Sequence, residues 1–288
     1  MSARIIDGKR VAAGIKDDLS RRVRAVRDAG GTVRLDAVLV ESGDTGARVY
    51  AENQGRTCGQ LGIDYRLHKL DRSADRDDIA ARIEQLNDDP DVHAIMLHMP
   101  VPERVDAYSL QRLIDPDKDV EGVNPANIGN IVYGRSSLAP CTALATIQMI
   151  RSTGVELRGR RMVVVGASNV VGKPIAVLAM RDEATVISCN KFTQGIEALA
   201  RSADVLVVGC GVAELVGAEW VKPGAVVVDV GVNRVPGPNG KMRTVGDVKF
   251  SAVSEVAGWI SPVPGGVGPV TVAMLLRTVV EVSERLVS

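Results

Sequence analysis

The sequence predicts an α/β protein with two domains. The chain has 288 residues, a length typical of roughly two domains. Short apolar runs alternate along it with longer segments of helical period, which is the pattern of α/β folds. The runs in the second half consist almost entirely of Val and Ile. Strands of a parallel sheet that is covered on both faces have this composition.

The first half alternates strands and helices. Its apolar runs are too short for helices, and the segments between them carry apolar residues at helical spacing. Each strand, with the following helix and the next strand, can form a right-handed crossover unit. The predicted order is a helix over 11–29, a strand over 35–40, a helix over 50–61, a strand over 65–70, a helix over 76–87 and a strand over 94–99.

The second half repeats the alternation after a polar stretch at 134–139 and a helix over 141–150. We place the domain boundary at this stretch. The first domain is predicted to contain residues 1–139 and the second residues 140–269. The final helix, over 270–286, is expected to return to the first domain together with the chain end at 288. Strands are predicted over 161–165, 185–189, 205–209 and 225–230.

Composition limits the possible partners and compartment. The 35 basic and 35 acidic side chains balance, which argues against a general nucleic-acid binder. The one dense basic stretch, 21–27, is interleaved with valines and is typical of a solvated helix face. The four cysteines form no CxxC pair, the first residues lack a signal-peptide core, and no apolar run approaches the roughly 20 residues of a membrane span. We expect a cytoplasmic protein with no membrane partner and no metal.

Two glycine-rich segments indicate ligand contact. Residues 262–271 carry three prolines and three glycines with almost no charge, which lets a rigid backbone approach a flat ligand. The alternative is a tight turn before the last helix. In the second segment, the strand ending at Val165 enters a turn bounded by Gly166 and Gly172, followed by helix-like sequence. This context suits a dinucleotide pyrophosphate, although the spacing is not GxGxxG and a turn without ligand remains open.

The end of the next strand bears on the choice of cofactor. An NAD enzyme usually places an acid there for the ribose 2′-hydroxyl. Residues 188–191 contain none. Lys191 can instead neutralise a 2′-phosphate, so NADP is favoured over NAD. The alternative is a solvated loop lysine.

These motifs closely resemble the bifunctional methylenetetrahydrofolate dehydrogenase/cyclohydrolase family. The likeness covers essentially the whole chain, and its most specific part is the proline-glycine segment. The matching residues are Ile5–Lys9, Tyr50, Cys58, Gly62, Ile63, Asp117–Val120, Gly122, Pro125, Asn127, Gly129, Gly166–Ser168, Gly172–Pro174, Val230–Arg234, Gly246–Val248 and Pro262–Thr271.

The resemblance implies an α/β folate-binding domain, a Rossmann-like NADP-binding domain, a cleft between them, and a homodimer. It implies hydride transfer from 5,10-methylenetetrahydrofolate to NADP, followed by hydrolysis of the methenyl product. It implies substrate contacts by Tyr50, His98, Met99, Pro100, Glu121, Pro264 and Gly265, with the last two lying between nicotinamide and pterin. The implied cofactor residues are Thr142, Gly166, Ala167, Ser168, Val171, Lys191, Gly209, Val232, Gly265, Gly266, Gly268 and Thr271.

The sequence departs from the family at positions expected to be catalytic. Gln54 stands where the family has its catalytic lysine, and a glutamine amide has neither a titratable proton nor a positive charge. We therefore expect weak or absent cyclohydrolase activity. His98 replaces a glutamine and could act as an alternative proton carrier facing Gln54. Glu121 replaces the aspartate that pairs with the pterin, and Ala143 replaces a proline after Thr142.

Several functions remain open at this point. The favoured one is an NADP-dependent methylenetetrahydrofolate dehydrogenase. A related cyclic aminal or iminium substrate is a variant of it, and a bifunctional enzyme that uses His98 is another. The alternative from a different class is a folate- or NADP-binding protein without catalysis.

Overall fold

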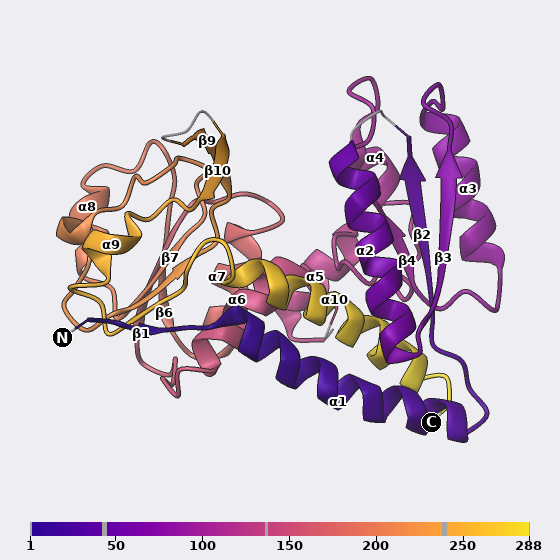
Figure 1. The fold of residues 1–288 in the computed structure, drawn as a ribbon, viewed down its shortest axis with the longest axis horizontal. Coiled ribbons are helices and arrows are strands. Elements are labelled where there is room, and N and C mark those ends of the chain that lie inside the picture. The colour runs from indigo at the N-terminus through magenta and orange to yellow at the C-terminus, as the bar shows by residue number, and fades with distance from the viewer. Residues whose placement is uncertain (1, 42–44, 136–137, 238–240, 288) are drawn as a thin grey trace. The chain divides into compact units, whose positions relative to one another are not determined.

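The computed structural model describes residues 2–41, 45–135, 138–237 and 241–287. It confirms the α/β class (Figure 1). The contacts divide the chain into two compact units. The six-stranded unit combines the described residues of 1–13 and 140–274. The three-stranded unit combines those of 14–139 and 275–288. Part of the polar stretch at which we expected the boundary, residues 136–137, lies outside the described residues.

The larger sheet of the six-stranded unit is parallel, in the order β1-β11-β8-β7-β5-β6. Its strands are almost wholly apolar because helices cover the sheet. They are β1 (Arg4–Ile5), β5 (Arg161–Val165), β6 (Thr185–Cys189), β7 (Val205–Val208), β8 (Val226–Asp229) and β11 (Trp259–Ile260). The other elements are α6 (Cys141–Arg151), α7 (Gly172–Arg181), α8 (Ile196–Arg201), η1 (Ala218–Trp220), α9 (Phe250–Val253) and the hairpin β9 (Asn233–Pro236) with β10 (Met242–Val245).

All four strands predicted in the second half are present, with bounds that agree to within one residue. We did not predict β1 and β11, which have two residues each. Such short strands show no periodicity and are defined by their backbone partners. Ile6 N, directly after β1, donates to Ile260 O at 2.9 Å. The first residues of the chain thus add an edge strand to the sheet that carries the second glycine-rich turn.

The three-stranded unit has a parallel sheet in the order β3-β2-β4. Every residue of the central strand is buried. Val38 and Val40 pack with α3, whereas Leu39 packs with α2, so the two helices cover opposite faces (Figure 1). The elements are β2 (Arg34–Val40), α2 (Thr45–Leu61), β3 (Asp64–Leu70), α3 (Arg76–Asp88), β4 (Ile95–Leu97), α4 (Ala107–Gln111) and α5 (Pro125–Tyr133). The predicted third strand, 94–99, is shorter in the structure: β4 ends at Leu97, and His98 N still donates to Val38 O of β2 at 2.8 Å.

Two helices contribute residues to both units: α1 (Gly8–Asp28) and α10 (Val267–Glu284). Within the three-stranded unit the two helices are joined by Arg22, whose Nη2 lies 2.7 Å from Glu284 Oε2. This hydrogen bond is the main reason why the pKa of Arg22 is raised. The final helix begins three residues earlier than predicted, inside the proline-glycine segment.

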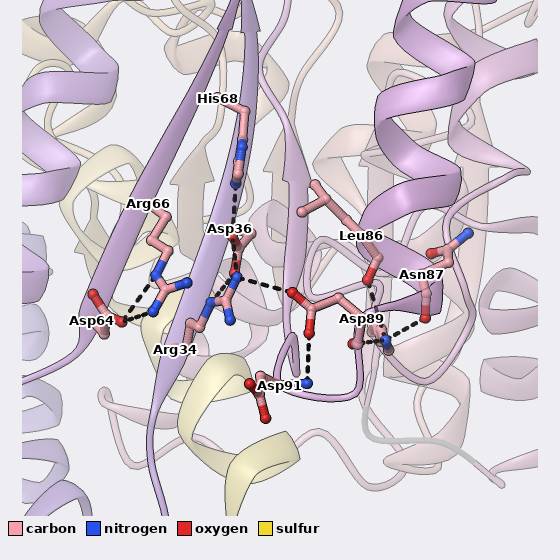
Figure 2. Close-up of polar contacts among 10 residues, drawn as sticks. Arg34, Asp36, Asp64, Arg66, His68, Leu86, Asn87, Asp89 and Asp91 are labelled. Carbon is pink, nitrogen blue, oxygen red and sulfur yellow. Dashed lines mark hydrogen bonds and ion pairs between the residues drawn. The ribbon is translucent and has the colours of Figure 1, made fainter.

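A buried ionic network lies on the α3 face of this sheet (Figure 2). Arg34 Nη2 donates to Asp36 Oδ1 at 2.9 Å, and His68 Nε2 lies 2.7 Å from the same oxygen. The Asp36 side chain is fully buried and that of Arg34 nearly so. Burial alone would lower the pKa of Arg34, but the hydrogen bond and charge of Asp36 raise it. Arg34 also approaches Asp89, at the end of α3, to 3.5 Å. The network joins β2, which carries Arg34 and Asp36, and β3, which carries His68, to the end of α3.

Candidate functional site

The candidate catalytic position Gln54 lies on the buried face of α2. Ala47, Ala51, Gln54 and Cys58 recur at helical spacing, and all four are buried. Only 2% of Gln54 is exposed. Tyr50 lies one turn earlier and is 41% exposed. A phenol ring that is exposed at one turn and an amide that is buried at the next therefore lie close together on one helix.

The amide of Gln54 is only half satisfied. Its Nε2 donates to Met96 Sδ at 3.3 Å, across to β4. Its Oε1 is buried and has no hydrogen-bond partner among the described residues. A buried acceptor without a donor costs on the order of 1–3 kcal/mol. The position therefore has one unused acceptor and no group that titrates.

His98 follows β4, is buried, and contacts Tyr50 and Tyr65. Its Nε2 lies 3.2 Å from Tyr65 Oη, and the Tyr50 ring meets it edge-on with centroids 5.9 Å apart. Burial lowers the pKa of His98 to about 4. Burial thus works against the role of proton carrier near neutral pH that the sequence left open for His98. The imidazole is neutral between pH 5 and 8, and its observed partners are the two tyrosines rather than Gln54.

Tyr65 is a site residue that the sequence analysis missed. It lies on β3, and burial raises the pKa of its phenol. The neighbouring Gly55 of α2 makes room for it, because a Cβ there would lie 2.8 Å from the Tyr65 ring. A glycine in mid-helix beside Gln54 was the available signal. It pointed to close packing, but not to the residue that uses the space.

The loop after β4 positions Glu121. Asp119 is fully buried, and its carboxylate accepts from Gly122 N at 3.1 Å, Asn124 N at 2.7 Å and Asn127 Nδ2 at 3.0 Å. Gly122 has φ 65°, and a Cβ there would overlap the backbone of Ala139. These constraints fix the loop on both sides of Glu121. They explain why Asp119, Gly122 and Asn127 accompany it in the sequence.

Glu121 is held as a neutral acid at neutral pH. Burial raises the pKa of its carboxyl to about 8, and the charge of Asp119 adds to the effect. In the unfolded chain the group ionises near 4.5. Between pH 4.5 and 8, the folded state therefore keeps the Glu121 proton that the unfolded chain has lost. The free energy of unfolding consequently falls as the pH rises from 4.5 to 8.

Glu121→Gln is expected to remove this pH dependence. The variant should exceed the wild type in free energy of unfolding by less than about 1 kcal/mol at pH 5 and by about 4 kcal/mol at pH 8.5. Urea denaturation at the two pH values, followed by circular dichroism, measures the difference. Glu103→Gln, an exposed glutamate of the same unit, serves as the control. An equal gain at both pH values would contradict the raised pKa.

The second candidate site lies at the carboxyl edge of the six-stranded sheet. Since its strands are parallel, the residues that follow β5, β6, β7, β8 and β11 lie along one edge. This edge contains most of the predicted cofactor residues. They are Gly166, Ala167, Ser168 and Val171 after β5, Lys191 after β6, Gly209 after β7, Val232 after β8, and Gly265, Gly266, Gly268 and Thr271 after β11. Thr142, in the first turn of α6, belongs to the same unit.

The turn after β5 forms a cradle that only glycine permits. Gly166 has φ 116°, and a Cβ at Gly172 would overlap the Gly166 carbonyl. A Cβ at Gly166 would in turn overlap Gly209, after β7. The turn leads directly into α7, whose N-cap residue, Val171, has no polar side chain that could cap the helix. Backbone N–H groups at such a helix start suit a pyrophosphate, so the residues present fit a dinucleotide.

Two aspartates hold the neighbouring loops. Asp247 accepts from Cys210 N at 2.7 Å, Gly211 N at 2.8 Å and Asn233 Nδ2 at 2.8 Å. It thus joins the loops after β7 and β8. Asp229 accepts from three backbone N–H groups, yet burial raises its pKa to about 6. Asp247 belongs to a motif named in the sequence analysis. Its three donors lie 14 to 37 residues earlier in the chain, so no local sequence pattern indicates that it accepts from them.

The proline-glycine segment packs against the start of the chain. A Cβ at Gly8, the first residue of α1, would overlap the Gly266 carbonyl, and Gly265 has φ 103°. Asp7 Oδ1 caps the same helix by accepting from Lys9 N at 2.9 Å. The start of α1 and the proline-glycine segment, which are far apart in the sequence, therefore lie in direct contact. Among the predicted substrate residues of the three-stranded unit, Met99 and Pro100 are exposed.

Other kinds of site are not found among the described residues. No group of three or more His, Cys, Asp or Glu side chains is arranged to hold a metal ion in this part of the chain. The four cysteines are free thiols. No described helix is both long and apolar enough to span a membrane.

Comparisons with known proteins match both halves of the chain to domains of one family. Residues 6–121 match the tetrahydrofolate dehydrogenase/cyclohydrolase catalytic domain, and residues 140–287 match the NAD(P)-binding domain of the same name. Bifunctional protein FolD 2 of Ruegeria pomeroyi is 45% identical, over 98% of this chain and 95% of that protein. The bifunctional FolD of Campylobacter jejuni superposes with a TM-score of 0.94 at 34% identity, covering 99% of this chain and all of that one. The Trypanosoma brucei FolD, determined with NADP and an inhibitor, has a TM-score of 0.92 at 32% identity, covering 100% and 99% of the two chains.

Proposed function

We propose that this chain, which belongs to the tetrahydrofolate dehydrogenase/cyclohydrolase family, oxidises 5,10-methylenetetrahydrofolate with NADP. The proposal also states that its cyclohydrolase activity is weak or absent. The observation that carries the second part is the environment of Gln54. This side chain occupies the family's lysine position, is buried, and contacts a methionine sulfur. The glycine cradle after β5 and the loop of Glu121 support the first part.

The cofactor is NADP, which accepts the hydride when bound. The chain's own task is to hold substrate and cofactor in reacting geometry and to exclude water. Gly166 and Gly172 give the pyrophosphate access to backbone N–H groups, and Lys191 faces the 2′-phosphate. The carboxylate of Glu121 accepts two parallel N–H groups from the aminopyrimidine edge of the pterin. Binding this group favours the ionised acid, so the substrate lowers the raised pKa of Glu121 when it binds.

Hydrolysis of the methenyl product has different needs. It requires a group that exchanges protons with water or with the hydrated intermediate. Gln54 has no such proton, and His98, with a pKa of about 4, is neutral and a weak base at pH 7. Hydride transfer needs no proton from either side chain. The dehydrogenase reaction is therefore retained, while hydrolysis loses its catalyst.

Two spectrophotometric assays test this function. Purified protein should reduce NADP with methylenetetrahydrofolate and should hydrolyse added methenyltetrahydrofolate hardly faster than buffer. No NADP reduction under any folate condition would contradict the proposal and favour a binding protein without catalysis. Fast hydrolysis that His98→Gln abolishes would favour a bifunctional enzyme using His98. Reduction only with another cyclic aminal would identify a related substrate.

The proposal assigns folate binding to residues 1–139 with the final helix and chain end, 270–288, and NADP binding to residues 140–269. It also includes a homodimer. In the described sheet, β3 pairs with β2 on one side and is the edge strand. An edge of seven residues is a template for a strand from a second copy. Size-exclusion chromatography with light scattering tests this, and a monomer at micromolar concentration would contradict it. The reducing cytoplasm, in which free thiols persist, is the proposed compartment.

A further inference from the structure

Phe192 is a strongly exposed aromatic side chain in the loop after β6. It is one of the two phenylalanines in the chain, and 79% of it is accessible to solvent. It follows Lys191 in the loop after β6. The Lys191 Nζ lies 5.0 Å from the centroid of its ring. An isolated exposed aromatic needs no explanation, but this one lies beside the cation that the cofactor proposal uses.

Hydrogen bonds fix the backbone of the loop that carries Lys191 and Phe192. Phe192 N donates to Asn190 Oδ1 at 2.9 Å, and Asn190 N donates to Thr193 Oγ1 at 2.9 Å. Thr193 N returns a bond to Asn190 O at 3.0 Å. These reciprocal bonds form a compact turn around Phe192. The ring is therefore presented to solvent by a preorganised loop rather than by a free chain.

The loop also begins beside the glycine cradle. Cys189, the last residue of β6, is the parallel partner of Val165, and Gly166 N donates to Cys189 O at 3.0 Å. The phosphate turn and the loop of Phe192 thus leave neighbouring strands at the same level of the sheet edge. In dinucleotide-binding sheets, the strand after the phosphate turn ends at the adenosine ribose.

We infer that Phe192 stacks on the adenine of the cofactor while Lys191 binds the 2′-phosphate. This inference rests on the proposed function. Adenine and the 2′-phosphate are attached to adjacent carbons of one ribose, so two adjacent side chains can contact both. One face of the ring lies under Lys191, and the other is available to a base. Stacking of a base on an aromatic side chain is insensitive to the phosphate, so the two residues have separable effects.

Calorimetric titration with 2′,5′-ADP and with 5′-AMP separates the two roles. Phe192→Ala should weaken both ligands about tenfold, whereas Phe192→Trp should retain affinity. Lys191→Ala should weaken 2′,5′-ADP and leave 5′-AMP nearly unchanged. Phe250→Ala is the matched control. It removes the other phenylalanine, which lies in α9 of the same unit and is 37% exposed, and should change neither ligand.

Nuclear magnetic resonance supplies a readout that a structural role would not move. In the wild type, the ring current of Phe192 should shift the adenine H2 and H8 signals of bound 2′,5′-ADP upfield, and Phe192→Leu should abolish the shift. Unchanged affinity in Phe192→Ala, or no upfield shift in the wild type, would overturn the inference. If both results hold but methylenetetrahydrofolate never reduces NADP, the proposed function fails and the adenine site stands.

Discussion

Gln54→Lys is expected to raise the rate of methenyltetrahydrofolate hydrolysis about 100-fold, because general acid–base catalysis contributes at least this factor. The buried position favours this outcome. Gln54 is 2% exposed and faces Met96. Desolvation lowers the pKa of an amine placed there, which brings its proton exchange toward neutral pH. NADP reduction should change little, since hydride transfer does not use this proton.

The matched control is Gln60→Lys, the same substitution on an exposed residue of the same helix. It should leave both activities unchanged. A thermal melt establishes that Gln54→Lys is folded, because a buried amine lowers stability. If the folded variant gains no hydrolysis, the lysine position alone does not limit the reaction. Gln54→Lys/His98→Gln then tests whether His98 has reshaped the site.

Asp36→Ala is expected to destabilise the three-stranded unit by about 3–5 kcal/mol. The carboxylate is fully buried, and Arg34 Nε lies 2.6 Å from it. Among the described residues, its removal leaves the buried guanidinium of Arg34 with Asp89 alone, at 3.5 Å, and also removes the partner of His68. Hydrogen exchange measured by mass spectrometry on peptides from β2 and β3 reports the free energy of local opening directly.

Asp64→Ala removes another aspartate of the same sheet. Its pair with Arg66 at 3.2 Å is half exposed at both ends (Figure 2), so the loss should stay below about 1 kcal/mol. Arg34→Met/Asp36→Leu, which replaces both charges with apolar groups, should lose less than Asp36→Ala. Equal losses in Asp36→Ala and Asp64→Ala would mean that water reaches the network.

The fold was predictable where local pattern determines structure. Val163–Val165 and Val205–Val208 are buried on both faces, and their composition alone identifies them as parallel strands. The misses are elements that depend on distant partners. Arg4–Ile5 is a strand only because Trp259–Ile260 lies beside it. The hairpin of β9 and β10 has half-exposed strands whose residues show no apolar alternation.

The candidate sites were predictable in identity but not in environment. The resemblance located Gln54, His98 and Glu121, yet no sequence pattern gives the burial that sets their protonation. His98 titrates far below neutral pH and Glu121 far above its usual range because each is desolvated. The sequence analysis did not identify Tyr65 and Phe192 as site residues, because neither belongs to a motif that we recognised. Their importance follows from their neighbours in space or at the sheet edge.

The pairing of β1 with β11 has a consequence for biosynthesis. Arg4 pairs with Trp259, more than 250 residues later in the chain. At typical elongation rates, the ribosome needs about 10 to 50 s to make the intervening segment. Throughout this time Arg4–Ile5 has no strand to pair with. The six-stranded sheet is thus completed only after Trp259 and Ile260 have been made, at the edge that β1 supplies.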